Sequence, residues 1–193
     1  MDLPVSAPFI LASASPRRSE LLTSAGFRFS IEPADVDESP LAGENPELYV
    51  LRVARDKART VAERCRKSAA VILAADTTVA VAGEILAKPE NDLDAIRMLR
   101  MLSGVVHDVF TGVVVRAGER ELSEVAHTRV RLLPITMDEI LWYIESGEPM
   151  GKAGAYGIQG RAARFVDWIE GSWSNVVGLP VATVYRLLKD LGA

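Results

Sequence analysis

Leu11-Ala-Ser-Ala-Ser-Pro-Arg-Arg-Ser-Glu-Leu-Leu22 follows the short apolar run Pro8-Phe9-Ile10, and it predicts a strand that feeds a helix through a tight serine-rich turn. Ser15 is a good N-cap and Pro16 a good first helical residue, because proline has no amide proton to leave unsatisfied there. The stretch therefore indicates that the chain opens with a strand–helix unit.

Two arginines, Arg17 and Arg18, stand in the first turn of this predicted helix. A helix N-terminus already carries positive partial charge, so cations are locally unfavourable there. The pair is explained if an anion binds at this point, most naturally a phosphate, because amide and guanidinium groups both donate to its oxygens. From these residues alone, a solvated surface pair remains the alternative.

Composition sets the class of protein. The 193 residues carry a net charge of −4, which argues against wholesale binding of nucleic acid. The only cysteine, Cys65, cannot form an internal disulfide, and the apolar runs are too short to span a bilayer. No basic segment precedes the first apolar stretch, as a secretory signal would require. We expect one domain over residues 1–193, cytoplasmic, with no membrane and no nucleic-acid partner.

Strand and helix patterns alternate in the first half of the chain, and a hairpin interrupts the second half. Helices are predicted from Asn45 to about Arg66, after Asn91, after the capping box that begins at Thr136, and at 180–191. Strands are predicted at 27–32 and 71–75, and an antiparallel hairpin at 105–115 and 121–133. The expected fold is α/β, with a mixed sheet flanked by helices.

Asp76 ends the continuous apolar run Val71–Ala75, which is the pattern of a strand buried on both faces. Active-site residues of open α/β sheets usually lie at such strand ends. The alternative, an aspartate that caps a following turn, is weaker because strand character resumes at Val79. Glu38 belongs to an acidic loop that is either solvated, as its composition favours, or part of a cation site. Lys57, on the helix that starts at Asn45, reads as a surface lysine.

Five glycines crowd the loop at 147–160. The loop is not a Walker A motif, because Gly151-Lys152 is followed by Ala153, and the spacing of its glycines excludes a dinucleotide fingerprint. Glycines at this density let the backbone approach a ligand closely, and flexibility alone is the alternative.

Taken together, these stretches resemble the Maf family of nucleoside triphosphate pyrophosphatases. The resemblance runs nearly end to end, through residues 11–22, 36–38, 54–58, 74–79, 87–89, 98–104, His107, 111–112, 152–160 and 175–180. It implies a mixed α/β fold like that of the inosine triphosphatases, with two lobes around a cleft. It also implies hydrolysis between the α and β phosphates with a divalent metal, Mg²⁺ or Mn²⁺, in nucleotide-pool house-cleaning linked to cell-division control. Homodimerisation is expected by resemblance only.

Site residues follow from the resemblance and from residue chemistry. The forms Ser-Pro-Arg-Arg, Asp-Thr and Ile-Gln-Gly resemble the branch that prefers dTTP and UTP, rather than the branch that prefers 7-methyl-GTP. In that pattern Asp76 is the catalytic carboxylate, and Glu38 and Asp76 are the candidates to hold the metal through oxygen ligands. The residues expected to bind the substrate are Ser13, Arg17, Arg18, Lys57, Thr77, Lys88 and Gln159.

Whether Asp76 acts as base or as metal ligand stays open at this point, since one carboxylate can serve either role. Competing hypotheses are a nucleotide-binding regulator of septum formation without turnover and a metal-dependent phosphatase. Pyrophosphate, orthophosphate or no product distinguishes the three.

Overall fold

The computed structural model describes residues 7–65 and 69–192. Its elements in chain order are β1 (Phe9–Leu11), α1 (Pro16–Ser24), β2 (Ser30–Ile31), α2 (Pro46–Arg64), β3 (Val71–Val81), β4 (Glu84–Leu86), α3 (Asp92–Leu102), β5 (Val106–Ala117), β6 (Arg120–Leu132), α4 (Met137–Ile144), the 3-10 helices η1 (Ala153–Ala155) and η2 (Arg161–Phe165), β7 (Val166–Glu170), α5 (Trp173–Val177) and α6 (Val181–Leu191).

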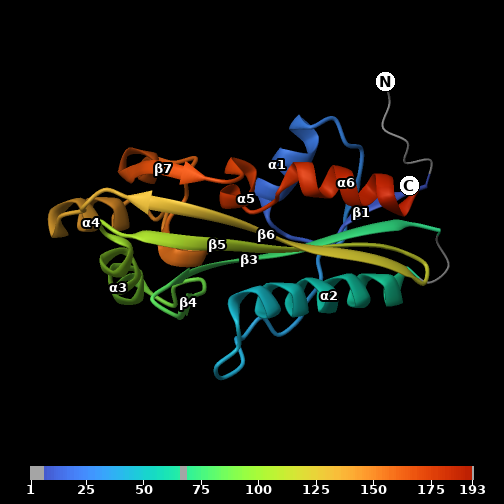
Figure 1. The fold of residues 1–193 in the computed structure, drawn as a ribbon, viewed down its shortest axis with the longest axis horizontal. Coiled ribbons are helices and arrows are strands. Elements are labelled where there is room, and N and C mark those ends of the chain that lie inside the picture. Colours follow the sequence, from blue (N-terminus) through green and yellow to red (C-terminus); the bar gives the residue numbers. More distant parts are fainter. Residues whose placement is uncertain (1–6, 66–68, 193) are drawn as a thin grey trace. The chain divides into compact units, whose positions relative to one another are not determined.

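One seven-stranded sheet connects the strands in the order β2-β1-β3-β5-β6-β7, with β4 paired to β3 (Figure 1). Strand β1 pairs in parallel with β2 and β3, whereas β3 with β4 and β6 with β7 are antiparallel. The predicted mixed α/β sheet is therefore confirmed. The chain divides into two compact units, one of residues up to Asp76, 111–126 and from Gly178 onward, the other of residues 77–110 and 127–177.

In the first unit, both faces of the sheet are covered by helices. Leu22 of α1 and Leu187 of α6 pack with Leu73 of β3 in one buried cluster. Ala58 of α2 packs with Ile72 of β3 in another. Figure 1 shows the same arrangement, with α1 and α6 on one side of the strands and α2 on the other. Because neighbouring residues of β3 point to opposite faces, burial on both faces explains its uninterrupted apolar sequence.

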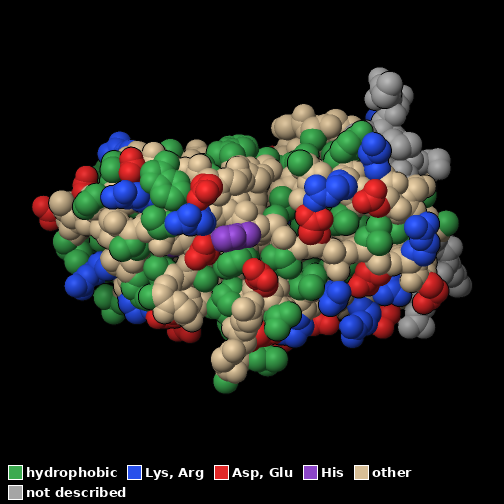
Figure 2. Space-filling view, viewed as in Figure 1, with side chains coloured by type: hydrophobic (Ala, Val, Ile, Leu, Met, Phe, Trp, Pro, Cys, Tyr) green, Lys and Arg blue, Asp and Glu red, His purple; other side chains and the backbone are tan. Residues whose placement is uncertain are grey.

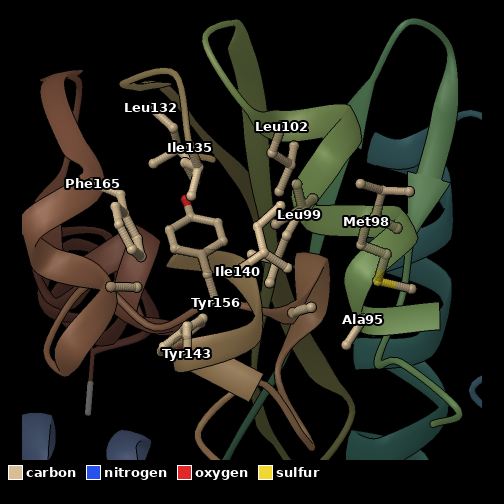
Figure 3. Packing of buried hydrophobic residues seen from close by; sticks show 14 of the residues in the cluster. Ala95, Met98, Leu99, Leu102, Leu132, Ile135, Ile140, Tyr143, Tyr156 and Phe165 are labelled. Carbon is tan, nitrogen blue, oxygen red and sulfur yellow. The ribbon is translucent and has the colours of Figure 1, made fainter. Parts of the chain in front are cut away.

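The second unit has a core of its own. Helices α3 and α4 and the loop that follows α4 pack on the strands through a cluster that includes Leu99, Ile140, Tyr143, Tyr156 and Phe165 (Figure 3). Helix α4 begins with the predicted capping box, in which the Thr136 side chain accepts from the Glu139 amide and the Glu139 carboxylate accepts from the Thr136 amide.

The predicted helix start is confirmed, because Ser15 is the N-cap residue of α1 and Pro16 is its first helical residue. The Ser15 side chain makes no capping hydrogen bond, and the Ser15 amide donates to Ser13 Oγ at 3.2 Å. The strand predicted at 27–32 is reduced to Ser30–Ile31, both exposed, because Phe27 is buried against the Phe9 ring rather than paired in a ladder.

Within the described residues, every helix is too short or too polar to cross a bilayer. On the face of the described chain seen in Figure 2, basic and acidic side chains are interspersed and form no continuous basic surface.

Candidate active site

Asp76 lies within strand β3 and is buried, with 6% of its surface exposed. Its Oδ1 accepts a hydrogen bond from Lys57 Nζ at 2.7 Å. The predicted strand end is thus a point within a longer strand, since β3 runs on to Val81. Asp76 is also where the first unit ends along this strand.

Lys57 corrects the prediction of a surface lysine. The residue is 5% exposed, and its Nζ lies 2.7 Å from Asp76 Oδ1 and 2.5 Å from Glu38 Oε1. A buried ammonium is tolerated only where charges of opposite sign satisfy it. The helix pattern alone could not show this, because both partners come from other elements.

Glu38 is the carboxylate of the acidic loop that turns inward, while Asp35 and Asp37 are exposed. Helix α2 holds the loop at this point. Tyr49 Oη donates to the Glu38 carbonyl at 2.7 Å, and Arg52 Nη2 donates to the Ser39 carbonyl at 3.1 Å. Burial raises the pKa of the Tyr49 phenol, and the charges of Asp76 and Glu38 raise it further, so Tyr49 stays a neutral donor.

Sequence reasoning missed Tyr49 as part of this site. The available signal was its spacing from Lys57, because residues eight apart return to the same face of a helix.

Arg18 is buried at the start of α1, where Nε donates to the Gly178 carbonyl and Nη1 to the Ala75 carbonyl, each at 2.8 Å. Nη1 also lies 3.2 Å from Ser13 Oγ. Burial lowers the pKa of the guanidinium, while the charges of Asp76 and Glu38 act in the opposite direction. Arg18 therefore holds the backbone beside Asp76, and Arg17 stands next to it, half-buried.

The first unit thus brings Ser13, Arg18, Glu38, Lys57 and Asp76 together. A basic residue is placed directly beside the buried Asp76 carboxylate and the half-buried Glu38 carboxylate, and this arrangement can orient a water molecule, bind phosphate oxygens or hold a cation.

Thr77, Lys88 and Gln159 belong to the second unit. Thr77 is half-buried on β3, whereas Lys88 and Gln159 are exposed. The segments that carry the last two are joined, because the Gly154 amide donates to the Ala87 carbonyl at 3.2 Å.

Gly154 also explains part of the glycine-rich sequence. Its φ is +67°, and a Cβ there would lie 2.9 Å from the Val79 side chain. Only glycine permits both the positive φ and this close approach to β3.

A family model described as Maf-like protein matches residues 8–191. The dTTP/UTP pyrophosphatase of Koribacter versatilis is 51% identical over 183 residues, which cover 95% of this chain and 94% of that protein. Proteins with the same name from Myxococcus xanthus and Geobacter sulfurreducens are 51% and 49% identical, over 95% of this chain and 92% and 96% of theirs.

A crystal structure described as nucleoside-triphosphatase / dITP/XTP pyrophosphatase from Mycobacterium abscessus covers 95% of this chain and 94% of its own. It has 15% identity and a TM-score of 0.41, too distant a likeness to support an inference. The family model and the relatives, in contrast, extend over nearly the whole sequence. The chain therefore belongs to the Maf family.

Proposed function

We propose that this protein hydrolyses dTTP and UTP to the nucleoside monophosphate and pyrophosphate. The observation that carries the proposal is the buried cluster in which Lys57 contacts both Asp76 and Glu38. Relatives that share about half of the sequence are named dTTP/UTP pyrophosphatases, which supports the choice of substrates.

In this reaction a water oxygen forms a bond to the α-phosphorus, the bond from that phosphorus to the α–β bridging oxygen breaks, and pyrophosphate leaves. Asp76 is the carboxylate that orients the water and takes its proton. A buried, hydrogen-bonded carboxylate keeps a fixed position, and a positioned base contributes about 10²–10⁴-fold to a rate. Lys57 fixes the Asp76 oxygen at 2.7 Å.

The triphosphate and the departing pyrophosphate are polyanions. Arg17 and Arg18 at the start of α1, together with Lys57, supply the positive charge of the first unit, and Lys88 supplies it from the second. Preorganised donors of this kind stabilise the charge that develops on the leaving group. The Arg18 contacts with two carbonyl oxygens hold its guanidinium before substrate arrives.

The donor set suits a hard divalent cation such as Mg²⁺ or Mn²⁺. Glu38 and Asp76 each place a carboxylate oxygen against Lys57 Nζ, so the two carboxylates lie near each other, and Mg²⁺ is commonly held by one or two carboxylates plus phosphates of the substrate. Within residues 7–65 and 69–192, no group of three or more His, Cys, Asp or Glu side chains could hold a metal. When bound, the ion would neutralise phosphate charge, and its affinity would depend on the nucleotide.

Gln159 and Thr77 are the proposed contacts to the pyrimidine. Both are neutral and carry donors as well as acceptors, which suits the edge of thymine or uracil. The exposure of Gln159 leaves its amide accessible to a ligand.

The test is a pyrophosphate-release screen over canonical and modified nucleoside triphosphates with Mg²⁺ and Mn²⁺. We expect release from dTTP and UTP, reduced at least about 100-fold in Asp76→Asn. Asp56→Asn, on the exposed side of α2, is the matched control and should keep wild-type turnover.

Other products would contradict the proposal in distinct ways. Orthophosphate as the product would show a phosphatase, and nucleotide binding without product would show a regulator. A preference for 7-methyl-GTP would overturn the choice of substrate and leave the reaction class intact.

A further inference from the structure

Gln159 is bracketed along the chain by two backbone hydrogen bonds to side chains. Two residues before it, the Gly157 amide donates to Tyr143 Oη at 3.2 Å. Two residues after it, the Arg161 amide donates to Glu148 Oε2 at 2.9 Å. Tyr143 lies in the last turn of α4, and Glu148 lies at the start of the same loop, so a helix residue and an earlier loop residue hold the backbone on the two sides of Gln159.

Buried side chains and a close backbone approach support these two hydrogen bonds. Tyr143 is fully buried within the core of the second unit (Figure 3). Ile158, between the two hydrogen-bonded amides, is 8% exposed. A Cβ at Gly160 would overlap the Glu148 carboxylate, so the glycine lets the loop close onto that side chain. Ile158 is thereby anchored inward while Gln159 stays exposed.

We propose that Tyr143 and Glu148 are positioning residues that fix Gln159 and so set the selectivity for the nucleobase. The inference rests on the proposed function, in which Gln159 reads the pyrimidine. A glutamine amide presents a donor and an acceptor, and it can pair with uracil or, after turning over, with cytosine. Discrimination between the two therefore requires that the backbone carrying the amide is held still.

Tyr143→Phe removes a single oxygen atom and keeps the buried ring in place. Glu148→Ala removes the second acceptor, whereas Glu148→Gln keeps an amide oxygen that can still accept from Arg161. The matched control is Ser103→Ala. Ser103 Oγ accepts from the Ile135 amide at 2.7 Å in the same unit, and neither residue belongs to the loop at 147–160.

The experiment measures kcat and KM for UTP and CTP in each variant. We expect the UTP-to-CTP ratio of kcat/KM to fall about tenfold in Tyr143→Phe and Glu148→Ala, mainly through a higher KM for UTP. Glu148→Gln and Ser103→Ala should keep the wild-type ratio. Amide hydrogen exchange should show faster exchange at Gly157 in Tyr143→Phe, which tests the loosened loop without any turnover.

Two outcomes would overturn the inference separately from the proposed function. If the wild type prefers UTP and both loop variants keep that preference, Tyr143 and Glu148 do not set selectivity. The same conclusion follows if the wild type does not distinguish UTP from CTP. If the wild type releases no pyrophosphate from UTP or dTTP, the proposed function fails, and this inference fails with it.

Discussion

Lys57 Nζ lies 2.7 Å from Asp76 Oδ1, and the two side chains are 7% and 8% exposed. The pair joins helix α2 to strand β3, and Glu38 attaches a loop to the same ammonium at 2.5 Å. One cation therefore neutralises the buried Asp76 carboxylate and the half-buried Glu38 carboxylate, which would otherwise repel each other. Removing it leaves a buried charge without a partner, which is far more destabilising than the loss of a surface ion pair.

Lys57→Met is expected to reduce the free energy of unfolding by about 3 kcal/mol, because the Asp76 and Glu38 carboxylates lose the cation that neutralises them. Turnover should fall at least about 100-fold through loss of phosphate stabilisation. Urea unfolding and a pyrophosphate assay measure the two effects. Arg59→Met, whose side chain is 64% exposed on the same helix, is the control and should leave both close to wild type. Wild-type stability in Lys57→Met would contradict the buried pair.

Tyr49→Phe tests the support of Glu38. Without the Tyr49 hydroxyl, the Glu38 carbonyl loses its 2.7 Å donor and the acidic loop loosens. We expect the half-saturating Mn²⁺ concentration for dTTP hydrolysis to rise roughly tenfold, with turnover recovering at high Mn²⁺. The Mn²⁺-dependent rise in Tm in the presence of nucleotide should weaken in parallel. Tyr185→Phe, at an exposed position of α6, should change neither quantity.

His107 makes the stability of the second unit dependent on pH. Its imidazole is fully buried, with Nε2 2.8 Å from Tyr156 Oη, and burial lowers its pKa to about 4 against the weak opposing charge of Asp108. The unfolded chain binds a proton below about pH 6.5, where the folded chain does not. Stability should therefore fall as pH drops from about 6.5 to about 4, by at most about 3 kcal/mol.

Unfolding in urea at several pH values measures this dependence. His107→Gln should flatten the curve over that window, whatever its absolute stability. Equal slopes in wild type and His107→Gln would show that His107 does not titrate as proposed.

Gly112→Ala tests the packing of β5 against α2. A Cβ at Gly112 would lie 2.5 Å from the Val50 carbonyl oxygen and 2.8 Å from the Leu51 amide, and neither backbone atom can move cheaply. We expect a loss of at least about 2 kcal/mol in the free energy of unfolding. Gly118→Ala is the control. A Cβ at Gly118 would have no atom within 4 Å, so this variant carries only the cost of its φ of +58° and no steric overlap. A smaller loss in Gly112→Ala than in Gly118→Ala would contradict the close approach.

Local patterns predicted much of the fold. The apolar run that begins at Val71, the capping box at Thr136 and the hairpin of β5 and β6 depend on residues close in sequence, and all three are present. The polar sequence Gly171-Ser-Trp-Ser-Asn175 is typical of a loop, yet Trp173–Val177 forms the short helix α5. Tertiary contact decided that case, because Asn175 is buried and its Nδ2 donates to the Val109 carbonyl.

The sequence predicts which residue types form the candidate site, but it predicts less well how deeply each side chain is buried and which partners it contacts. Asp76 stood out because a carboxylate interrupts an apolar strand. The burial of Lys57 and the inward turn of Glu38 depend on partners from distant elements, which no local period encodes. Arg18 was expected to face an anion, which stays a prediction, and the structure shows that its guanidinium donates to the carbonyl oxygens of Ala75 and Gly178.

The Arg18 contacts carry a consequence for biosynthesis. Arg18 and Gly178 are separated by 160 residues, and Arg18 and Ala75 by 57. A chain growing on the ribosome can dock α1 against β3 early, but the guanidinium gains its second carbonyl only after the segment that opens α6 has been made. Until then a buried cation beside Asp76 is incompletely satisfied. The backbone contacts that hold Arg18 beside Asp76 are therefore complete only after residues up to Gly178 have been made.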